Sequence, residues 1–347
     1  MTPITRRGSE AWARAPEDQP VMVDVLIPTI DRVPELGVTL AGLAAQDEPA
    51  FRVVISDQSA AFTSASAPAV QAMVRVLRAQ GRPVDVLHHA PPRGLAEQRQ
   101  FLLDRSRAEA VLYLDDDVWL EPGALSRLHD ALRVLGCGFV GSAPQGLSYL
   151  TDPRPQELTR FEEWGSHVEP ERVRPGEPAF ERWPLHNAAN LAHLAVALEP
   201  AGAGWTAYKI AWVGGCVLYD RAALVECGGF DFWPDVPAVH SGEDVAAQWR
   251  VMERFGGAGV LPSGAVHLEA PTTIPDRPVD AFDIVFPDHA PAPATVGADD
   301  VAASDADRSG ARQPGAHEPA AHQPAAQQPA AQQPAVQQQP LQDHDKE

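Results

Sequence analysis

The sequence predicts an α/β protein with a doubly wound, mostly parallel sheet and a disordered C-terminal tail. Over residues 21–136, short apolar runs rich in β-branched residues alternate with stretches in which apolar side chains recur at helical spacing. Strands and helices that alternate with connections of this length are typical of parallel sheets covered by helices. From about residue 290 onward, Ala, Pro and Gln replace the large apolar residues.

Four strands and four helices are expected in the first half of the chain. The strands are short apolar runs that end in polar or turn-forming residues, at 21–27, 51–55, 84–87 and 111–114. The helices are marked by leucine, valine and other apolar residues at helical spacing, at 36–43, 70–77, 95–103 and 125–135. Gly136 is expected to end the last of these helices.

Three parts are predicted along the chain. Residues 1–20 form an N-terminal extension, residues 21–287 a folded domain, and residues 288–347 a disordered tail. The tail repeats a P-A-A-x-Q pattern and has too few large apolar side chains to offset the entropy that is lost on ordering. Within the domain, the regular alternation loosens after residue 145. The second half is therefore expected to complete the sheet and to form the other wall of a cleft.

The composition excludes several classes of protein. The 347 residues carry 27 Lys and Arg against 47 Asp and Glu, a net charge of −20, which argues against binding to nucleic acid or to an anionic membrane. The three cysteines are odd in number and form no C-x-x-C pair, so a reducing compartment without disulfides or zinc is expected. There is no signal-peptide pattern and no apolar run of membrane-spanning length. We therefore expect a cytoplasmic protein without a transmembrane segment.

Polar residues just after the strands are the first candidates for a site, because ligands of doubly wound sheets bind beyond the carboxyl ends of the strands. They are Thr29 and Asp31, Asp57, and the run Asp115–Asp117. Three consecutive carboxylates repel one another unless a positive group neutralises them, and Mg²⁺ or Mn²⁺ prefers such oxygen ligands. The alternative is a solvated acidic turn that caps the following helix.

Seven short segments occur in an order that is more informative than any one of them. They are I-P-T-I-D-R at 27–32, V-I-S-D-Q-S at 54–59, G-L-A-E-Q-R-Q at 94–100, Y-L-D-D-D-V-W-L-E-P-G at 113–123, W-V-G-G-C at 212–216, G-G-F-D at 228–231 and G-E-D-V at 242–245. From residue 22 to about 270, the chain thereby resembles family 2 glycosyltransferases with the GT-A fold. It departs from the family pattern at Asp31 and Gln100, where the family has Asn.

The resemblance implies an inverting, metal-dependent glycosyltransferase of the hexosyltransferase type. Such an enzyme moves a sugar from a nucleoside-diphosphate donor to an acceptor hydroxyl, in glycan or glycoconjugate assembly. Residues 21–145 become the nucleotide-binding half and residues 146–287 the acceptor and catalytic half. The residues expected to bind the nucleotide sugar are Pro28, Thr29, Asp31, Asp57, Arg99, Asp115 and Asp116. For Asp57 a turn or helix cap is the alternative, and for Arg99 a solvated helix position.

The resemblance also assigns the metal and the base. Asp117 matches the second carboxylate of the D-x-D motif and is the expected ligand of Mn²⁺ or Mg²⁺, with His267 completing the site; a lone histidine is otherwise more commonly structural. Asp244 is the expected general base, with Glu243 beside it, although both residues also suit a helix cap. Because a helix N-terminus favours the ionised carboxylate, position rather than basicity is expected to select Asp244. On the acceptor side stand Trp212, Gly214 and Gly215.

Two other functions are left open by the sequence. A nucleotidyltransferase also places acidic clusters at strand ends, but it needs a Gly-rich, basic triphosphate loop, and residues 27–34 offer only Arg32. A non-catalytic nucleotide-sugar-binding or scaffold relative would keep the fold and bind the ligand without turnover. Such a relative would be insensitive to substitution of Asp244.

Overall fold

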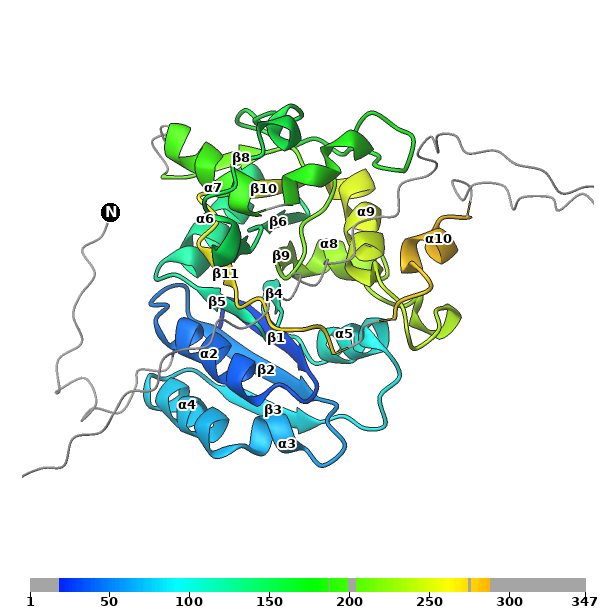
Figure 1. Cartoon of the computed structure of the whole chain (residues 1–347). Helices are drawn as coiled ribbons and strands as arrows, with labels where there is room; N and C mark the ends of the chain where they lie inside the picture. Colours follow the sequence, from blue (N-terminus) through cyan, green and yellow to red (C-terminus); the bar gives the residue numbers. More distant parts are fainter. Residues whose placement is uncertain (1–18, 187, 199–203, 274–275, 288–347) are drawn as a thin grey trace, which may run out of the picture. The chain divides into compact units, whose positions relative to one another are not determined.

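The computed structural model describes residues 19–186, 188–198, 204–273 and 276–287 (Figure 1). The chain divides into two units, residues 1–293 and 294–347, and all described residues belong to the first. Nearly all of the predicted N-terminal extension and the whole predicted tail at 288–347 lie outside the described residues, so both stay predictions.

The first half follows the predicted alternation. Its strands are β1 (Val23–Thr29), β2 (Phe51–Asp57), β3 (Val84–His88) and β4 (Ala110–Leu114). Its helices are α2 (Val33–Ala44), α3 (Thr63–Ser66), α4 (Pro68–Ala79), α5 (Leu95–Leu103) and α6 (Ala124–Leu135). The four predicted strands and four predicted helices are confirmed, and Gly136 ends α6 as predicted. The short α3 was not predicted, because four residues carry no periodicity.

The remaining elements are shorter. The other strands are β5 (Val118–Leu120), β6 (Phe139–Gly141), β7 (Gln145–Gly146), β8 (Thr206–Tyr208), β9 (Cys216–Asp220), β10 (Gly257–Leu261) and β11 (Ala265–His267). The other α-helices are α7 (Ala188–Ala197), α8 (Arg221–Glu226), α9 (Glu243–Phe255) and α10 (Ala281–Val285). Short 3-10 helices lie at Leu147–Tyr149, Pro155–Leu158, Phe180–His186 and Trp233–Asp235.

Eight strands form the main sheet, in the order β3-β2-β1-β4-β9-β6-β10-β8. The pairs β1 with β2, β2 with β3, β1 with β4, and β6 with β10 are parallel. The strand β9 lies antiparallel between β4 and β6, and β8 is antiparallel to β10 at the edge. The prediction of a mostly parallel sheet that the second half completes is confirmed.

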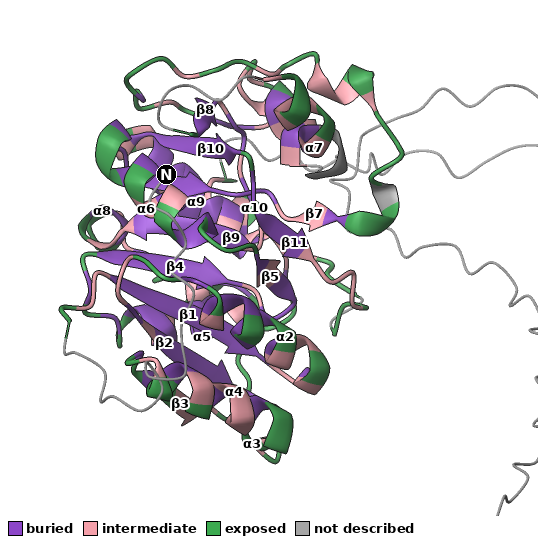
Figure 2. Cartoon of the chain, turned by 90° about the vertical axis from the view of Figure 1, so that its left-hand side faces the viewer, coloured by how far each residue is buried: buried purple, intermediate pink, exposed green. Residues whose placement is uncertain are grey.

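Helices cover both faces of this sheet. Successive residues of a strand point to opposite sides, so each strand contributes side chains to both helical layers. Val25 and Ile27 of β1 pack in one buried cluster with residues of α2, α4 and α6. Leu26, between them, belongs to a second cluster with residues of α5, α8 and α9. Figure 2 shows the strands of the main sheet buried between the two helical layers.

A second, three-stranded sheet, in the order β5-β11-β7, lies at the carboxyl end of β4 (Figure 2). The strand β5 follows β4 after three residues and pairs antiparallel with β11, which comes from the far end of the described chain. This sheet joins the acidic turn after β4 to the segment that contains His267.

The cysteines and the described helices bear on two predictions from the sequence, that the chain has no disulfides and no transmembrane segment. Cys137 and Cys216 are buried and Cys227 is half-buried, and all three are free thiols. Within the described part of the chain, no helix has the length and apolarity needed to cross a membrane.

Substitution of Gly42 tests the packing of α2 behind the acidic turn. A Cβ at this position would lie 2.8 Å from the backbone nitrogen of Leu120 and 2.9 Å from Cδ1 of Trp119. We expect Gly42→Ala to lower the free energy of unfolding by about 1–3 kcal/mol, since the crowded atoms include backbone. Gly37→Ala on the same helix is the matched control, because a Cβ there meets nothing within 4 Å; it should stabilise by roughly 0.5–1 kcal/mol. Equal effects in urea denaturation would contradict this packing.

Candidate active site

The polar residues predicted from strand ends meet at one edge of the main sheet. Thr29 ends β1 and is the register partner of Asp57, which ends β2. Asp115 directly follows β4, the parallel neighbour of β1 on its other side. The sheet topology therefore brings together residues that are far apart in the sequence, as expected for a parallel sheet.

The small sheet adds His267 to this edge. His267 ends β11 and lies opposite Val118 of β5. The N–H of Leu268 donates to the carbonyl oxygen of Asp117 at 2.9 Å. The imidazole Nε2 of His267 lies 3.6 Å from Oδ2 of Asp117. The predicted proximity of His267 to the acidic turn is thus observed, although a role in metal binding does not follow from it.

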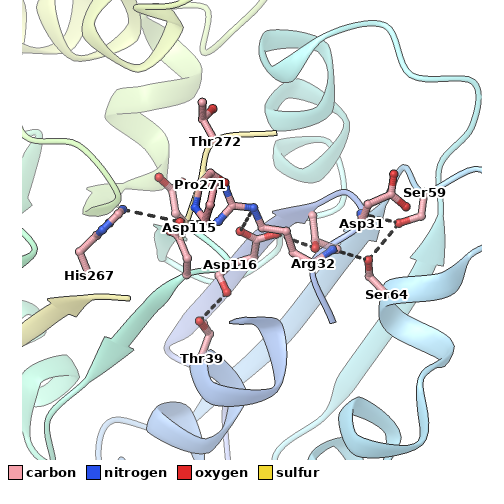
Figure 3. A network of polar contacts seen from close by, with 12 residues as sticks. Asp31, Arg32, Thr39, Ser59, Ser64, Asp115, Asp116, His267, Pro271 and Thr272 are labelled. Atoms are coloured by element: carbon pink, nitrogen blue, oxygen red, sulfur yellow. Dashed lines mark hydrogen bonds and ion pairs between the residues drawn. The ribbon is translucent and has the colours of Figure 1, made fainter. Parts of the chain in front are cut away.

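Each of the three consecutive aspartates has its own partner; Figure 3 labels two of them, Asp115 and Asp116, near Arg32. The contacts are Asp115 Oδ1 with Arg99 Nη2 at 3.1 Å, Asp116 Oδ2 with Thr29 Oγ1 at 2.6 Å, and Asp117 Oδ2 with Arg32 Nη1 at 2.6 Å. The side chain of Asp115 is 37% exposed, whereas those of Asp116 and Asp117 are 12% and 10% exposed. Asp115 is therefore the aspartate of this turn that is most open to a ligand.

Asp116 is turned into the protein. Burial raises the pKa of Asp116 to about 8; the hydroxyl of Thr29 opposes this rise, and the neighbouring charge of Asp117 adds to it. The hydroxyl of Thr39, in α2, donates to the carbonyl oxygen of Asp116 at 2.7 Å and fixes the turn. The raised pKa of Asp116 favours the protonated carboxyl, and the contacts of Asp116 with Thr29 and Thr39 support the turn. A contact of Asp116 with the nucleotide sugar stays a prediction.

Arg99 bridges the acidic turn and helix α9. Its Nη2 contacts Asp115, and its Nε donates to Oε1 of Glu243 at 3.2 Å. Burial acts to lower the pKa of Arg99, but Asp115 and Glu243 more than offset it, so that the pKa is raised. Arg99 lies in the second turn of α5 and is buried. Its guanidinium positions two carboxylates, and a contact with the nucleotide stays a prediction.

The pKa of Asp244 is higher than expected for a carboxylate at a helix N-terminus. Burial raises the pKa of Asp244 to about 7, and the charges of Glu243 and Asp115 add to this effect against that of Arg99. The helix N-terminus is outweighed here because the carboxylate lies among other carboxylates in a poorly solvated position. The neighbouring Glu243 is only 4% exposed and is held by Arg99. A raised pKa in this position is compatible with a general base, and that role of Asp244 stays a prediction.

Gly214 and Gly215 lie between the two carboxylates that flank the site. A Cβ on Gly214 would stand 3.8 Å from Oδ2 of Asp244, and one on Gly215 would stand 3.4 Å from Oδ2 of Asp115. Gly215 has a φ of +71°, which disfavours other residues. The half-buried Trp212 precedes them and has the imidazole of His186 stacked on it, with 5.5 Å between ring centroids. Of the predicted acceptor-side residues, Gly214 thus lies beside Asp244 and Gly215 beside Asp115.

Three of the predicted nucleotide-binding residues, Pro28, Thr29 and Asp57, are buried. Pro28 and Thr29 are buried, and Thr29 donates its hydroxyl to Asp116. Asp57 is fully buried, and its two carboxylate oxygens accept the backbone N–H groups of Ser59 and Ala65, each at 2.8 Å. These contacts are those of the turn-stabilising alternative, and a contact of Asp57 with a base or ribose stays a prediction.

Asp31 explains one departure from the family pattern. Its φ is +53°, a region that Asn and Asp occupy more readily than other non-glycine residues. Its N–H donates to Oγ of Ser59 at 2.8 Å. The replacement of Asn by Asp thus preserves the backbone conformation, and the side chain of Asp31 is exposed just after β1.

The divalent cation implied by the resemblance requires ligands with available lone pairs. Asp117 is instead paired with Arg32. The Nδ1 atom of His267 accepts the N–H of Glu269 at 2.9 Å, which leaves the proton of the neutral ring on Nε2, the nitrogen that faces Asp117. Among the described residues, no group of three or more His, Cys, Asp or Glu side chains is placed to hold a metal ion. This arrangement does not fit a divalent cation.

Arg32 was not predicted as a site residue, although it ends the first of the quoted motifs. Its guanidinium lies beside the acidic turn, and its N–H donates to Oγ of Ser64 at 2.9 Å. The signal available in the sequence was a lone arginine four residues after Pro28, on the same strand end as the predicted nucleotide site. Sequence alone did not indicate that α2 would direct it toward Asp117.

Comparison with known proteins finds a family match within the chain. Residues 24–182 match the model of the family described as Glycosyl transferase family 2. The chain is also 33% identical, over 122 residues, to the succinoglycan biosynthesis protein ExoM of Rhizobium meliloti (strain 1021). That match covers 34% of this chain and 37% of ExoM, so it spans well under half of either protein.

Two solved structures resemble the chain at low sequence identity. One is the mannosyltransferase PcManGT of Pyrobaculum calidifontis in complex with GDP-Man and Mn²⁺, with a TM-score of 0.46, 16% identity, and coverage of 76% of this chain and 64% of that one. The other is residues 1–349 of TarS from S. aureus, with a TM-score of 0.46, 16% identity, and coverage of 72% of this chain and 61% of that one.

The role of Asp57 as a loop-stabilising residue is testable. Replacing it by Ala leaves two buried N–H groups without acceptors, so we expect Asp57→Ala to lower the free energy of unfolding by about 1–3 kcal/mol. Asp85→Ala is the control, because the Asp85 side chain is 52% exposed and pairs only at the surface with Arg52. Its effect should stay within roughly 0.5 kcal/mol. Chemical denaturation compares the two, and a similar stability for both would contradict the structural role of Asp57.

Proposed function

We propose that this chain, whose residues 24–182 belong to glycosyl transferase family 2, transfers a sugar from a nucleoside-diphosphate donor to an acceptor hydroxyl. One observation carries the proposal: two carboxylates lie on either side of Gly214 and Gly215. The first belongs to Asp115, the most open aspartate of the acidic turn, and the second to Asp244, whose pKa is raised. A relative named for succinoglycan biosynthesis supports assembly of a glycan or glycoconjugate.

In the proposed reaction, Asp244 removes the proton of the acceptor hydroxyl. The acceptor oxygen forms a bond to the anomeric carbon of the donor sugar while the bond from that carbon to the diphosphate oxygen breaks. The nucleoside diphosphate leaves with the electron pair of the broken bond. Attack from the face opposite the leaving group inverts the configuration at the anomeric carbon. A carboxylate with a pKa near the working pH is suited to this proton transfer.

Arg99 and Glu243 position the base in this proposal. The guanidinium of Arg99 holds Asp115 at one end and Glu243 at the other, at 3.1 and 3.2 Å. Because Glu243 adjoins Asp244 in α9, this bridge fixes the distance between the donor side and the base. Glu243 is therefore proposed as a positioning residue and not as a second base.

The donor and the acceptor occupy opposite sides of the two glycines. The open carboxylate of Asp115 is suited to accept hydrogen bonds from ribose or sugar hydroxyls. Trp212 and the stacked ring of His186 form an aromatic wall near Asp244, and such a wall suits the apolar face of an acceptor sugar ring. A divalent cation has no step in this reaction, because Asp117 and His267 are engaged in other contacts.

Cysteine chemistry supports the cytoplasmic location that the sequence predicts. Cys137, Cys216 and Cys227 are free thiols. Burial raises the pKa of each of them, which keeps the thiols protonated and unreactive. A chain that folds with three free thiols suits a reducing compartment.

Binding of a nucleoside diphosphate is the first test of this function. We expect one of UDP, GDP, TDP, CDP or ADP to raise the thermal unfolding temperature of the full chain, since a ligand at 100 times its Kd stabilises by about 2.7 kcal/mol. Asp115→Asn should reduce the shift, because it removes the open carboxylate. Asp152→Asn, at an exposed ion pair with Arg154, should leave it unchanged. The absence of a shift with all five nucleotides would contradict the proposal.

The pH dependence of transfer tests the base. Asp244 acts only when ionised, so kcat/KM should rise with pH through the neutral range and level off above it. Asp244→Asn should lower kcat by about 10²–10⁴-fold and remove this rise. Glu226→Gln, an exposed carboxylate in the last turn of α8, is the matched control and should keep the wild-type profile. Near wild-type transfer by Asp244→Asn in initial-rate assays would show that the base lies elsewhere.

A further inference from the structure

Arg32 joins three segments on the donor side of the site (Figure 3). It follows β1 and immediately precedes α2. Its Nη1 donates to Oδ2 of Asp117 at 2.6 Å, and its Nη2 donates to the carbonyl oxygen of Pro271, in the segment after β11, also at 2.6 Å. The backbone N–H of Arg32 is held by Ser64. The guanidinium is therefore fixed at the acidic turn between β4 and β5.

The surroundings of His267 orient its Nε2 as a hydrogen-bond donor. Glu269, whose N–H contacts Nδ1 of His267, has a φ of +56°, a costly conformation for a residue with a Cβ. The carboxylate of Glu269 accepts hydrogen bonds from the backbone N–H and the hydroxyl of Ser148, which hold it in place. A metal ligand would need its lone pair on Nε2 and its proton on Nδ1, where the Glu269 N–H already points.

Resting on the glycosyl transfer proposed above, we propose that Arg32, assisted by the Nε2–H of His267, binds the diphosphate of the donor directly, in place of a divalent cation. A guanidinium offers a planar pair of N–H groups that matches two phosphate oxygens. As the bond from the anomeric carbon to the diphosphate oxygen breaks, that oxygen keeps the electron pair, and charge grows on the phosphate. Arg32 stabilises this charge by hydrogen bonds and transfers no proton.

Asp117 then serves as the resting partner of Arg32. Its carboxylate holds the guanidinium beside the acidic turn, with the Arg32 side chain 11% exposed, until phosphate oxygens replace it. Under this inference, neutralising Asp117 leaves Arg32 with an uncompensated charge, so diphosphate binding should be kept or strengthened. If Asp117 instead ligated a metal, neutralising it would abolish metal-dependent binding. The two arrangements thus predict opposite results for one substitution.

Calorimetric titration of the full chain distinguishes direct binding of the diphosphate by Arg32 from binding through a metal ion on Asp117. The ligands are UDP, GDP, TDP, CDP and ADP and the corresponding monophosphates, each in EDTA and in Mn²⁺. The wild-type protein should bind one diphosphate with similar affinity in both buffers. Arg32→Gln should weaken diphosphate binding roughly tenfold to a hundredfold, as expected when charge-assisted hydrogen bonds are lost, and should weaken monophosphate binding less. Arg32→Lys, which keeps the charge but not the fork, should fall between, and Arg133→Gln, on the exposed side of α6, should match the wild type.

Each outcome bears on the inference. Binding in EDTA that persists in Asp117→Asn and falls in Arg32→Gln supports it. Binding that requires Mn²⁺ and is lost in Asp117→Asn overturns it while leaving the proposed glycosyl transfer intact. If no diphosphate binds the wild type in either buffer, the proposed function itself is overturned, and this inference with it. Should Arg32→Gln fail to fold by circular dichroism, Arg32→Lys decides, and equal weakening of its diphosphate and monophosphate binding overturns the inference.

Discussion

Neutralisation of three neighbouring carboxylates at the end of β4 is the constraint on which the rest of the site depends. Unpaired, these charges would repel one another in a poorly solvated turn. The environment of each carboxylate is different: Arg99 pairs with Asp115, burial raises the pKa of Asp116 so that its neutral form is favoured, and Arg32 pairs with Asp117. Each solution also ties the turn to another element. Arg99 also contacts Glu243 of α9, next to the proposed base. Thr29, the partner of Asp116, belongs to β1, and Arg32 immediately precedes α2.

This distribution of charge gives the two sides of the site separate tasks. On one side, Arg99 and Glu243 hold Asp244 among carboxylates, and burial there supplies the basicity that proton removal needs. On the other side, Arg32 supplies a positive charge next to the most open aspartate. The loop that follows β2 supports this charge indirectly, because Asp57 fixes the segment whose serines hold the backbone of Asp31 and Arg32.

Much of the fold was predictable from sequence, because periodicity and strand ends are local signals. Residues 95–103 and the polar residues after β1, β2 and β4 lie as predicted. The antiparallel insertion of β9 and the pairing of β11 with β5 were not predictable, since both join distant segments by backbone contacts that leave no local pattern. The partners of the site side chains could not be predicted from the sequence either. The sequence placed Asp116, Asp117 and Asp244 at the site, but burial and neighbours decide which one keeps a proton, which one pairs and which one is basic.

A crystal structure of the full chain with its nucleoside diphosphate, grown in Mn²⁺ and measured at the manganese absorption edge, tests the central claim most directly. The account predicts that the guanidinium of Arg32 lies within hydrogen-bond distance of the phosphate oxygens, and that no anomalous peak lies between Asp117 and the diphosphate. A manganese ion coordinated by Asp117, His267 and phosphate oxygens, with Arg32 displaced, would contradict it.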